Sequence, residues 1–345
     1  MVRRYRIAVI EGDGIGPEII REALKVLDAT GIEYELVKAE AGYNYYRRTG
    51  RVFEEDFIDK LRSADAVLKA PLTTPPGSSG YRSVNVFIRR ELDLYANVRP
   101  FRSYPGISLS SFNFTIVREN TEGLYVGFEY THRDTSFTVR VVSRFGCERI
   151  VRFAFNYALK RGFRRVTCVH KANILKESDG LFRSIFWSVA EEYSGLEANE
   201  MLVDAAAYNL VKNPGFFNVI VTGNLYGDIL SDEAAGLVGS LGLCGSAQIG
   251  DEHAVFEPVH GSAPDIAGKG VANPVGEIKA LQLMLEYLYE KHGDEKLLKA
   301  SKAVDEALYK VLCVEGVRTP DLGGDASTSK LGSRVAEVVG ELLKY

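Results

Sequence analysis

The stretch YRIAVIEGDGIGPEIIREALKVLDATG, residues 5–31, decides the class of fold. It opens with an apolar, β-branched run, continues through a glycine-rich turn and ends in a segment whose apolar residues recur at helical spacing. Pro17 falls in the first helical turn, where a missing N–H costs nothing, and Gly31 is a typical helix C-cap. The stretch therefore predicts a strand, a tight turn and a helix.

The turn raises the question of a dinucleotide-binding loop, because backbone N–H groups at a helix start attract phosphate. The Rossmann fingerprint is G-x-G-x-x-G, and its third glycine allows close packing of helix and strand. The glycines of residues 12–16 are spaced G-x-G-x-G, and Pro17 stands where the third glycine should be. Glu33 or Glu35 lies at a suitable distance to bind a ribose, so the pattern alone leaves the role open but favours an ordinary turn.

Similar runs follow along the chain, among them ADAVLKA (64–70), RRVTCVH (164–170) and FNVIVTG (217–223), with amphipathic segments between them. This alternation predicts an α/β fold with a largely parallel sheet. One segment differs: TSFTVRVVSR, residues 135–144, alternates like an antiparallel strand with one exposed face. It is either an arm that pairs with another subunit or a simple surface hairpin.

Composition excludes several classes of protein. The 345 residues are 46% hydrophobic and carry a net charge of −4, with no basic region of the kind that binds nucleic acid. No apolar run is long enough to cross a membrane, and the first residues lack the pattern of a signal peptide. The four cysteines are far apart, which argues against a zinc site or disulfides. We expect a soluble, cytoplasmic protein.

An acidic pair is the strongest local signal. In TGNLYGDILSDEAAG, residues 222–236, Asp228 and Asp232 are four apart and would project from one face of a helix. Like charges at this spacing repel unless water or a cation lies between them. Their apolar neighbours indicate a buried helix, and an all-oxygen ligand set suits Mg²⁺ or Mn²⁺. The spacing alone leaves a metal site and a solvated acidic edge both open.

Three arginines, Arg89, Arg99 and Arg118, border apolar runs rather than lying in a charged block. Arginine binds carboxylates through its planar fork, so together these side chains would suit a small anion with several carboxylates. Each could equally be an ordinary surface arginine. Ser83 and Asn85, two residues apart, would face the same side of an extended strand and add neutral hydrogen bonds.

Two further segments suggest chemistry. Lys171 directly follows a predicted strand, at the end where α/β sheets keep their active sites. A lysine beside Tyr125 would lower the pKa of the tyrosine for proton transfer, although the sequence does not show that the two meet. The segment FEPVHGSAPDIAGKGVANP, residues 256–274, is a long loop rich in Gly, Pro and Ala, and such loops tend to be functional.

The motifs EGDGIGPE, RRELDLYANVRP, VRENTEGLY, HKANI, GDILSDEAAGLVGSLG and the loop just quoted together resemble the β-decarboxylating dehydrogenases. This family contains isocitrate, homoisocitrate and 3-isopropylmalate dehydrogenases, and the resemblance covers essentially the whole chain. It implies an α/β, two-domain isocitrate/isopropylmalate dehydrogenase-like fold that is not a Rossmann fold. Residues 1–96 and 244–345 would form a cofactor-binding domain. Residues 97–243 would form a dimerisation and metal-binding domain, with an arm near 125–145.

The resemblance also assigns roles. Tyr125 matches the general acid, and Lys171, supplied by the neighbouring subunit, matches the residue that assists proton removal. Asp228 and Asp232 match two metal ligands, and Asp204 matches a third from the neighbouring subunit. The substrate carboxylates would be bound by Ser83, Asn85, Arg89, Arg99 and Arg118. The NAD would be bound by Thr73, His260, Gly261, Ser262, Ala263, Pro264, Asp265, Ile266 and Asn273.

The implied reaction is metal-dependent, NAD-linked oxidative decarboxylation of a 2-hydroxy tricarboxylic acid in a homodimer with shared active sites. Ser83 and Asn85 resemble the isocitrate enzymes, so isocitrate is favoured, with homoisocitrate or dual use as the alternative and isopropylmalate behind both. Asp265 and Ile266, with Pro320 and Gly324, stand where NADP-using relatives carry phosphate-binding side chains. A non-catalytic regulatory subunit is disfavoured, because the tyrosine, lysine and aspartates are all present.

Overall fold

The alternating segments build one large sheet. The computed structural model describes residues 3–75 and 83–344. Its main sheet has ten strands, which lie side by side in the order β2 (Tyr34–Lys38), β1 (Tyr5–Ile10), β3 (Ala66–Lys69), β12 (Ala254–Pro258), β11 (Gly245–Ile249), β4 (Ala96–Arg102), β5 (Asn113–Glu119), β10 (Val219–Thr222), β8 (Arg165–His170) and β9 (Glu197–Leu202).

The sheet is largely parallel, as predicted. β11 runs antiparallel to both β12 and β4, and β4 runs antiparallel to β5. The six other neighbouring pairs are parallel. β3 and β10 are buried along their whole length, as expected of strands that are covered on both faces. The α/β prediction is confirmed.

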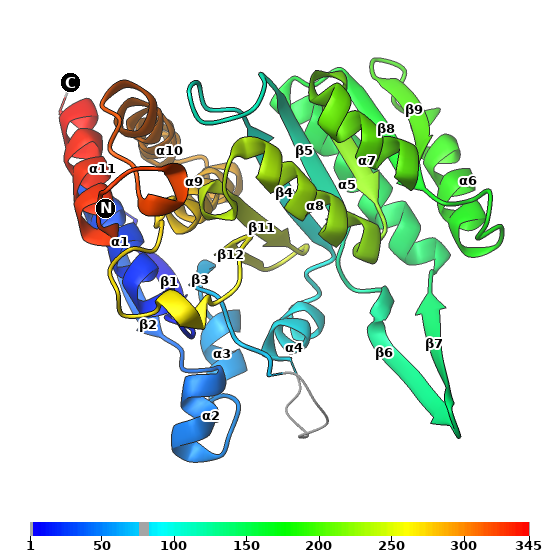
Figure 1. The fold of residues 1–345 in the computed structure, drawn as a ribbon, viewed down its shortest axis with the longest axis horizontal. Coiled ribbons are helices and arrows are strands. Elements are labelled where there is room, and N and C mark those ends of the chain that lie inside the picture. The colour runs from blue at the N-terminus through cyan, green and yellow to red at the C-terminus, as the bar shows by residue number, and fades with distance from the viewer. Residues whose placement is uncertain (1–2, 76–82, 345) are drawn as a thin grey trace.

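Helices cover both faces of the sheet (Figure 1). The helices are α1 (Gly16–Ala29), α2 (Tyr43–Thr49), α3 (Phe57–Arg62), α4 (Val84–Glu91), α5 (Arg144–Arg161), α6 (Ser178–Ala190), α7 (Val203–Lys212), α8 (Asn224–Val238), α9 (Val275–His292), α10 (Glu295–Tyr309) and α11 (Thr328–Leu343). In β10, Ile220 belongs to the core cluster that contains Leu230 of α8, whereas Val221 belongs to the cluster that contains Ile150 of α5. Because successive strand residues point to opposite faces, α8 and α5 cover opposite faces here.

The N-terminal turn is glycine-rich because another loop lies against it. Gly12 and Gly14 have positive φ values of 72° and 57°. A Cβ on Gly14 would lie 1.9 Å from the carbonyl oxygen of Ser262, and Ile15 N–H donates to that same oxygen over 2.9 Å. The glycines therefore allow the 256–274 loop to pack closely against this turn.

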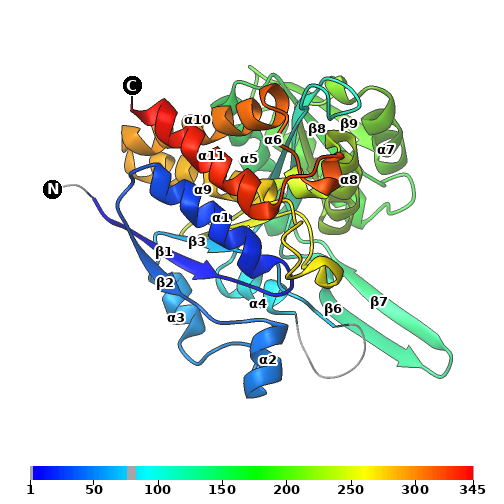
Figure 2. The same ribbon diagram turned by 60° about the vertical axis from the view of Figure 1, so that its left-hand side comes forward.

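The molecule has two halves along the sheet. The strands β1–β3, β11 and β12 lie with α1 and α9–α11 in one half, and β8–β10 lie with α5–α8 in the other (Figure 1, Figure 2). The elements of the first half come from the two chain segments, 1–96 and 244–345, that are predicted to form the cofactor-binding domain. Their assignment to separate domains stays a prediction. Among the described residues, no helix has the length and apolarity that a membrane span requires.

A two-stranded arm projects from the second half (Figure 1, Figure 2). It pairs β6 (Gly123–His132) with β7 (Thr135–Val141) in antiparallel register. The alternation in this segment predicted one covered face, but within this single chain its apolar side chains are exposed. The exposed fractions are 63% for Phe128, 59% for Tyr130, 51% for Phe137 and 53% for Val139. The arm therefore presents an apolar face that its own chain leaves uncovered.

Candidate active site

Asp228 is the centre of the largest group of predicted site residues. One of its carboxylate oxygens accepts hydrogen bonds from the guanidinium groups of Arg118 and, over 3.5 Å, of Arg99. The other oxygen accepts the Tyr125 hydroxyl over 2.6 Å. The Arg118 guanidinium also lies 5.1 Å from the centre of the Tyr125 ring. The structure thus brings these four candidate residues together.

The fold explains why these side chains meet. Arg118 near the end of β5 lies in register with Thr222 at the end of β10, and α8 starts two residues later. Asn224 in the first turn of α8 accepts both the Nε and Nη2 protons of Arg118, at 3.0 and 2.7 Å. At Gly227 a Cβ would lie 2.6 Å from Arg118 Cγ, so the helix can pass this side chain only with glycine at that position.

The three predicted arginines form a field of positive charge. Burial, together with repulsion from Arg118 and Arg89, lowers the pKa of the Arg99 guanidinium to about 10. Burial and the charge of Arg118 also lower the pKa of Arg89. Burial opposes ionisation of Asp228, but Arg118, the Tyr125 hydroxyl and Arg99 outweigh it and lower the pKa of this carboxyl. A bound anion would relieve the repulsion among the arginines, because it adds negative charge where they face one another.

A second, buried network holds Arg89, and the sequence analysis missed its members. Arg89 Nε donates to Gln248 over 2.7 Å, and its Nη2 lies 3.9 Å from Glu257. Glu257 also accepts hydrogen bonds from Gln248 and forms an ion pair with Lys69, whose side chain is 1% exposed. Lys69 and Glu257 are single charges inside otherwise apolar strands. A charge in that setting needs a buried partner, and this signal could have identified the pair.

Ser83 and Asn85 require a correction. They do not lie on an extended strand. Ser83 is the N-cap of α4 and accepts the Val86 N–H at 3.5 Å, and Asn85 is already helical. A serine before an apolar-periodic segment is an N-cap signal, which the strand interpretation overlooked. Because a helix has 3.6 residues per turn, positions two apart point in different directions. Within the described residues, the Asn85 side-chain oxygen is buried without a hydrogen-bond partner.

Asp228 and Asp232 lie on successive turns of α8, on one face of the helix. Burial, with the neighbouring charge of Asp228, raises the pKa of Asp232 in spite of Arg99. A divalent cation would stabilise both carboxylates, and their oxygens suit Mg²⁺ or Mn²⁺. Within residues 3–75 and 83–344, however, no three His, Cys, Asp or Glu side chains gather closely enough to hold a metal. The described part of this one chain therefore offers no third His, Cys, Asp or Glu ligand beside the pair.

Asp204 and Lys171 form a separate pair. Lys171 follows the last residue of β8, as predicted, and Asp204 lies in the first turn of α7. The Lys171 ammonium forms an ion pair with Asp204 and, through this hydrogen bond, lowers the pKa of the carboxyl. Among the described residues, no ion pair or hydrogen bond joins Lys171 to Tyr125. Within this chain Lys171 therefore pairs with Asp204 and not with Tyr125, whose pKa a neighbouring lysine would lower.

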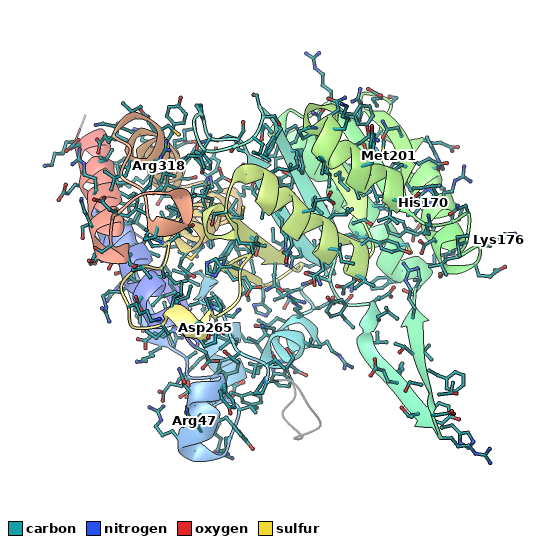
Figure 3. All side chains as sticks on the ribbon, in the orientation of Figure 1. Arg47, His170, Lys176, Met201, Asp265 and Arg318 are labelled. Atoms are coloured by element: carbon teal, nitrogen blue, oxygen red, sulfur yellow. The ribbon has the colours of Figure 1, made fainter. Side chains whose placement is uncertain are left out.

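The predicted cofactor loop follows β12. Thr73 and Ser262 hydroxyls lie 2.6 Å apart, and Pro264–Ile266 forms a short helical turn in which Asp265 is exposed (Figure 3). His260 is partly buried, and burial lowers the pKa of its imidazole. Within the described residues its Nε2 atom has no hydrogen-bond partner. An unpaired buried donor or acceptor is costly, so this atom fits a ligand group better than an empty loop.

Asn273 connects this loop to the segment near residue 320. Its side-chain amide donates to Asp321 over 3.0 Å, and its oxygen accepts the Val275 N–H at the start of α9. Asp321 also accepts the hydroxyls of Ser240 and Thr319. Pro320 and Gly324, both singled out from the sequence, flank Asp321 in the chain. The described structure therefore brings the two predicted cofactor segments into contact.

Comparison with known proteins identifies the class. The family model described as isocitrate/isopropylmalate dehydrogenase matches residues 6–335. An isocitrate dehydrogenase structure from Methylococcus capsulatus superposes with a TM-score of 0.92 at 44% identity, covering 97% of this chain and 99% of that chain. A β-decarboxylating dehydrogenase structure from Thermococcus kodakarensis gives a TM-score of 0.84 at 40% identity, covering 99% and 97%.

The chain belongs to the isocitrate/isopropylmalate dehydrogenase family of β-decarboxylating dehydrogenases. A homoisocitrate dehydrogenase of Methanocaldococcus jannaschii is 44% identical over 354 residues, covering 98% of this chain and 99% of its own. A 3-isopropylmalate/3-methylmalate dehydrogenase of the same organism is 47% identical over 347 residues, with the same coverage. An isocitrate/homoisocitrate dehydrogenase of Thermus thermophilus is 47% identical over 341 residues, again with 98% and 99% covered. Relatives of similar identity thus carry different substrate names.

Proposed function

We propose that the protein catalyses the NAD-linked, metal-dependent oxidative decarboxylation of isocitrate to 2-oxoglutarate, CO₂ and NADH. Homoisocitrate, converted to 2-oxoadipate, is the alternative substrate, alone or together with isocitrate. The observation that carries the proposal is the pairing of Arg99 and Arg118 with a carboxylate that also accepts the Tyr125 hydroxyl, while the charge of Arg89 acts on the same carboxyl. This arrangement supports a substrate with several carboxylates next to a proton donor.

Ser83 and Asn85 support a third carboxylate rather than an apolar group. Asn85 lies in the first turn of α4, and the NH₂ group of its side chain would donate to a substrate carboxylate. A 3-isopropylmalate enzyme would need an apolar lining for its branched substituent. Isocitrate and homoisocitrate differ by one methylene, which is worth only about 1–3 kcal/mol in a pocket, so activity with both is compatible with this site.

The residues have defined tasks in the proposed reaction. Asp228 and Asp232, with Asp204 of a second copy, would hold Mg²⁺ or Mn²⁺, which when bound acidifies the substrate hydroxyl and stabilises the negative charge that develops on decarboxylation. Lys171 of that second copy assists removal of the hydroxyl proton. The arginines would hold the substrate carboxylates and so fix the orientation of the substrate in the site. Tyr125 then donates its proton to the enol carbon after CO₂ has left.

NAD would bind against the loop from His260 to Ile266, with Thr73 and Asn273. Asp265 is exposed on this loop and its carboxylate would accept hydrogen bonds from the ribose hydroxyls. The same charge would repel the 2′-phosphate of NADP. Ile266, Pro320 and Gly324 offer no cation to that phosphate. We therefore propose NAD as the cofactor.

A homodimer with shared sites accounts for two features. The arm exposes an apolar face, and Tyr208, Val211 and Ile229 on α7 and α8 are exposed by 60% or more. Exposed apolar patches of this kind mark protein interfaces. Among the described residues of this chain, Asp204 belongs to no group of three His, Cys, Asp or Glu side chains that could hold a metal. A second copy seated on the arm and on these helices would bring this pair to the Asp228 cluster of its neighbour. A cytoplasmic location remains a prediction.

Steady-state assays test the proposal directly. The pure protein should reduce NAD in the presence of Mg²⁺ with isocitrate, with homoisocitrate or with both, and only weakly with 3-isopropylmalate. A preference for 3-isopropylmalate would overturn the assignment of substrate. Absence of turnover with all three acids, with either Mg²⁺ or Mn²⁺, would overturn the enzymatic proposal and favour a non-catalytic subunit.

A further inference from the structure

Asp179 is a buried carboxylate that the proposed reaction does not use. It lies in the first turn of α6 and is 1% exposed. One of its oxygens accepts the backbone N–H of Lys171 over 2.6 Å. The other oxygen forms an ion pair with Arg140 of the arm strand β7. Both oxygens are therefore committed, one to the turn that carries Lys171 and one to the arm.

Other bonds fix the same turn around Lys171. Its carbonyl oxygen accepts the N–H groups of Ile174 and Leu175 at 3.0 and 2.9 Å. The next N–H, of Ala172, donates to the ring Nδ1 of His170 over 3.1 Å. Asp179 supplies the one bond in this set that comes from a charged side chain. Hydrogen bonds to an ionised group are shorter and stronger than neutral ones, so this bond contributes most to holding the turn.

Arg140 extends the connection to α8. Its guanidinium lies 5.1 Å from the centre of the Tyr226 ring, and its Nη2 atom would be 3.2 Å from a Cβ on Gly223. Tyr226 precedes Asp228 by two residues on the same helix. The base of the arm, the turn at Lys171 and the first turn of α8 therefore all meet at the Asp179–Arg140 pair.

We propose that Asp179 is a positioning residue that fixes the backbone of Lys171 and, through Arg140, ties the lysine to the arm. This inference rests on the proposed role of Lys171 in proton removal. Since an error of about 1 Å in the placement of a reacting group can cost about 100-fold in rate, loss of this bond would slow the proton step more than it weakens substrate binding.

The kinetic test compares Asp179→Ala and Asp179→Asn with a matched control. Asp179→Ala removes both contacts, whereas the amide oxygen of Asp179→Asn can still accept the Lys171 N–H. We expect kcat to fall by about 10–100-fold in the alanine variant and by less in the asparagine variant, with KM for NAD changed less than about twofold. Asp305→Asn is the control, because Asp305 also pairs with two cations, Arg102 and Lys279, at 2.7 and 2.8 Å. Its kcat should stay near that of the wild type.

A kcat of Asp179→Ala within about twofold of the wild type, in folded protein, would overturn the inference, as would an equal loss in Asp305→Asn. A readout without substrate separates this result from failure of the proposed function. The rate of reductive methylation of the Lys171 amine, measured by mass spectrometry against exposed Lys212, should rise in Asp179→Ala and stay unchanged in Asp305→Asn. If the wild type turns over none of the acids, the proposed function fails, and the methylation rates still decide whether Asp179 positions Lys171.

Discussion

The Asp228 cluster and the Lys171–Asp204 pair are built in opposite ways. The first gathers side chains from β4, β5, β6 and α8, and behind it lies the buried network of Lys69, Glu257 and Gln248. The second consists of two side chains at the ends of β8 and β9, and Asp204 is 65% exposed. One region is assembled and largely enclosed within a single chain, although the Asp228 side chain is 40% exposed. The other is an ion pair whose carboxylate is exposed to solvent. We expect this exposure of residues that contribute to the active site of a neighbouring subunit.

The largest expected effect tests this division between subunits. Lys171→Met and Asp228→Asn should each abolish turnover on their own. When the two are unfolded together and refolded, mixed dimers should regain part of the activity, because one of their two sites combines an intact cluster with an intact lysine. Activity of the mixture is the measurement, with each variant refolded alone as the control. Heterodimers that form and remain inactive would show that each site is built within one chain.

Tyr125→Phe tests the enclosed region alone. The variant keeps the ring beside Arg118 but loses the hydroxyl that donates to Asp228 and supplies the proposed proton. We expect kcat to fall by about 10²–10⁴-fold, the usual contribution of a placed acid or base, with metal binding retained. Rapid turnover by this variant would remove Tyr125 from the mechanism and leave its hydrogen bond as a structural one.

The two regions should also respond differently in stability. Lys69→Met leaves Glu257 without its buried ammonium partner, and breaking a buried pair from one side costs about 3–5 kcal/mol. Lys171→Met breaks an exposed pair and should cost much less, because solvent screens the two charges. Urea unfolding of both variants measures the difference. Equal losses would contradict the contrast between an enclosed and an open region.

The next prediction concerns the choice between NAD and NADP, which we assign to the 256–274 loop in the other half of the molecule. We expect at least a 100-fold preference for NAD over NADP in kcat/KM, which corresponds to about 2.7 kcal/mol of differential transition-state binding. Replacing Asp265 by Lys and Ile266 by Tyr should remove most of it, since the loop would then attract the 2′-phosphate. Comparable kcat/KM values for the two cofactors in the unmodified protein would exclude the role given to Asp265.

The smallest effect concerns a carboxylic acid behind the enclosed region. Glu277 is fully buried, and neither of its oxygens has a hydrogen-bond partner among the described residues. Burial raises its pKa well above the ordinary value. The folded protein therefore keeps this proton while the unfolded chain loses it, so the folded state loses stability as the pH rises above about 4.3, the ordinary pKa of a glutamate.

Glu277→Gln removes this dependence. Its thermal midpoint should exceed that of the wild type by a few degrees at pH 8, and the gap should shrink toward pH 5. Circular dichroism melts at both pH values measure the gap. Glu290→Gln on the same helix, where the side chain reaches solvent, is the control. A gap that is equal at both pH values would show that Glu277 is ionised in the fold.

Local patterns in the sequence predicted the elements well, because helix and strand periodicity depends on near neighbours. They placed Asp228 and Asp232 on one helix face and Lys171 after a strand. They did not reveal Lys69, Gln248 and Glu257, whose pairing depends on strand order across the sheet. Spacing by two predicts a strand for Ser83 and Asn85, whereas the N-cap signal of Ser83 predicts the helix start that the structure has. The Lys171–Asp204 pair depends on two strands whose adjacency no local pattern encodes.

Gly227 has a consequence for how this site can diversify. A single added methyl group would meet Arg118 Cγ at 2.6 Å and push the helix that carries both aspartates away from the arginines. Substitution at Gly227 therefore cannot change the distance between the arginines and the pair Asp228 and Asp232 in small steps. The start of α4 carries no such constraint, since Asn85 has a side-chain oxygen with no protein partner among the described residues. Descendants of this sequence would therefore acquire new substrates through α4 sooner than through α8.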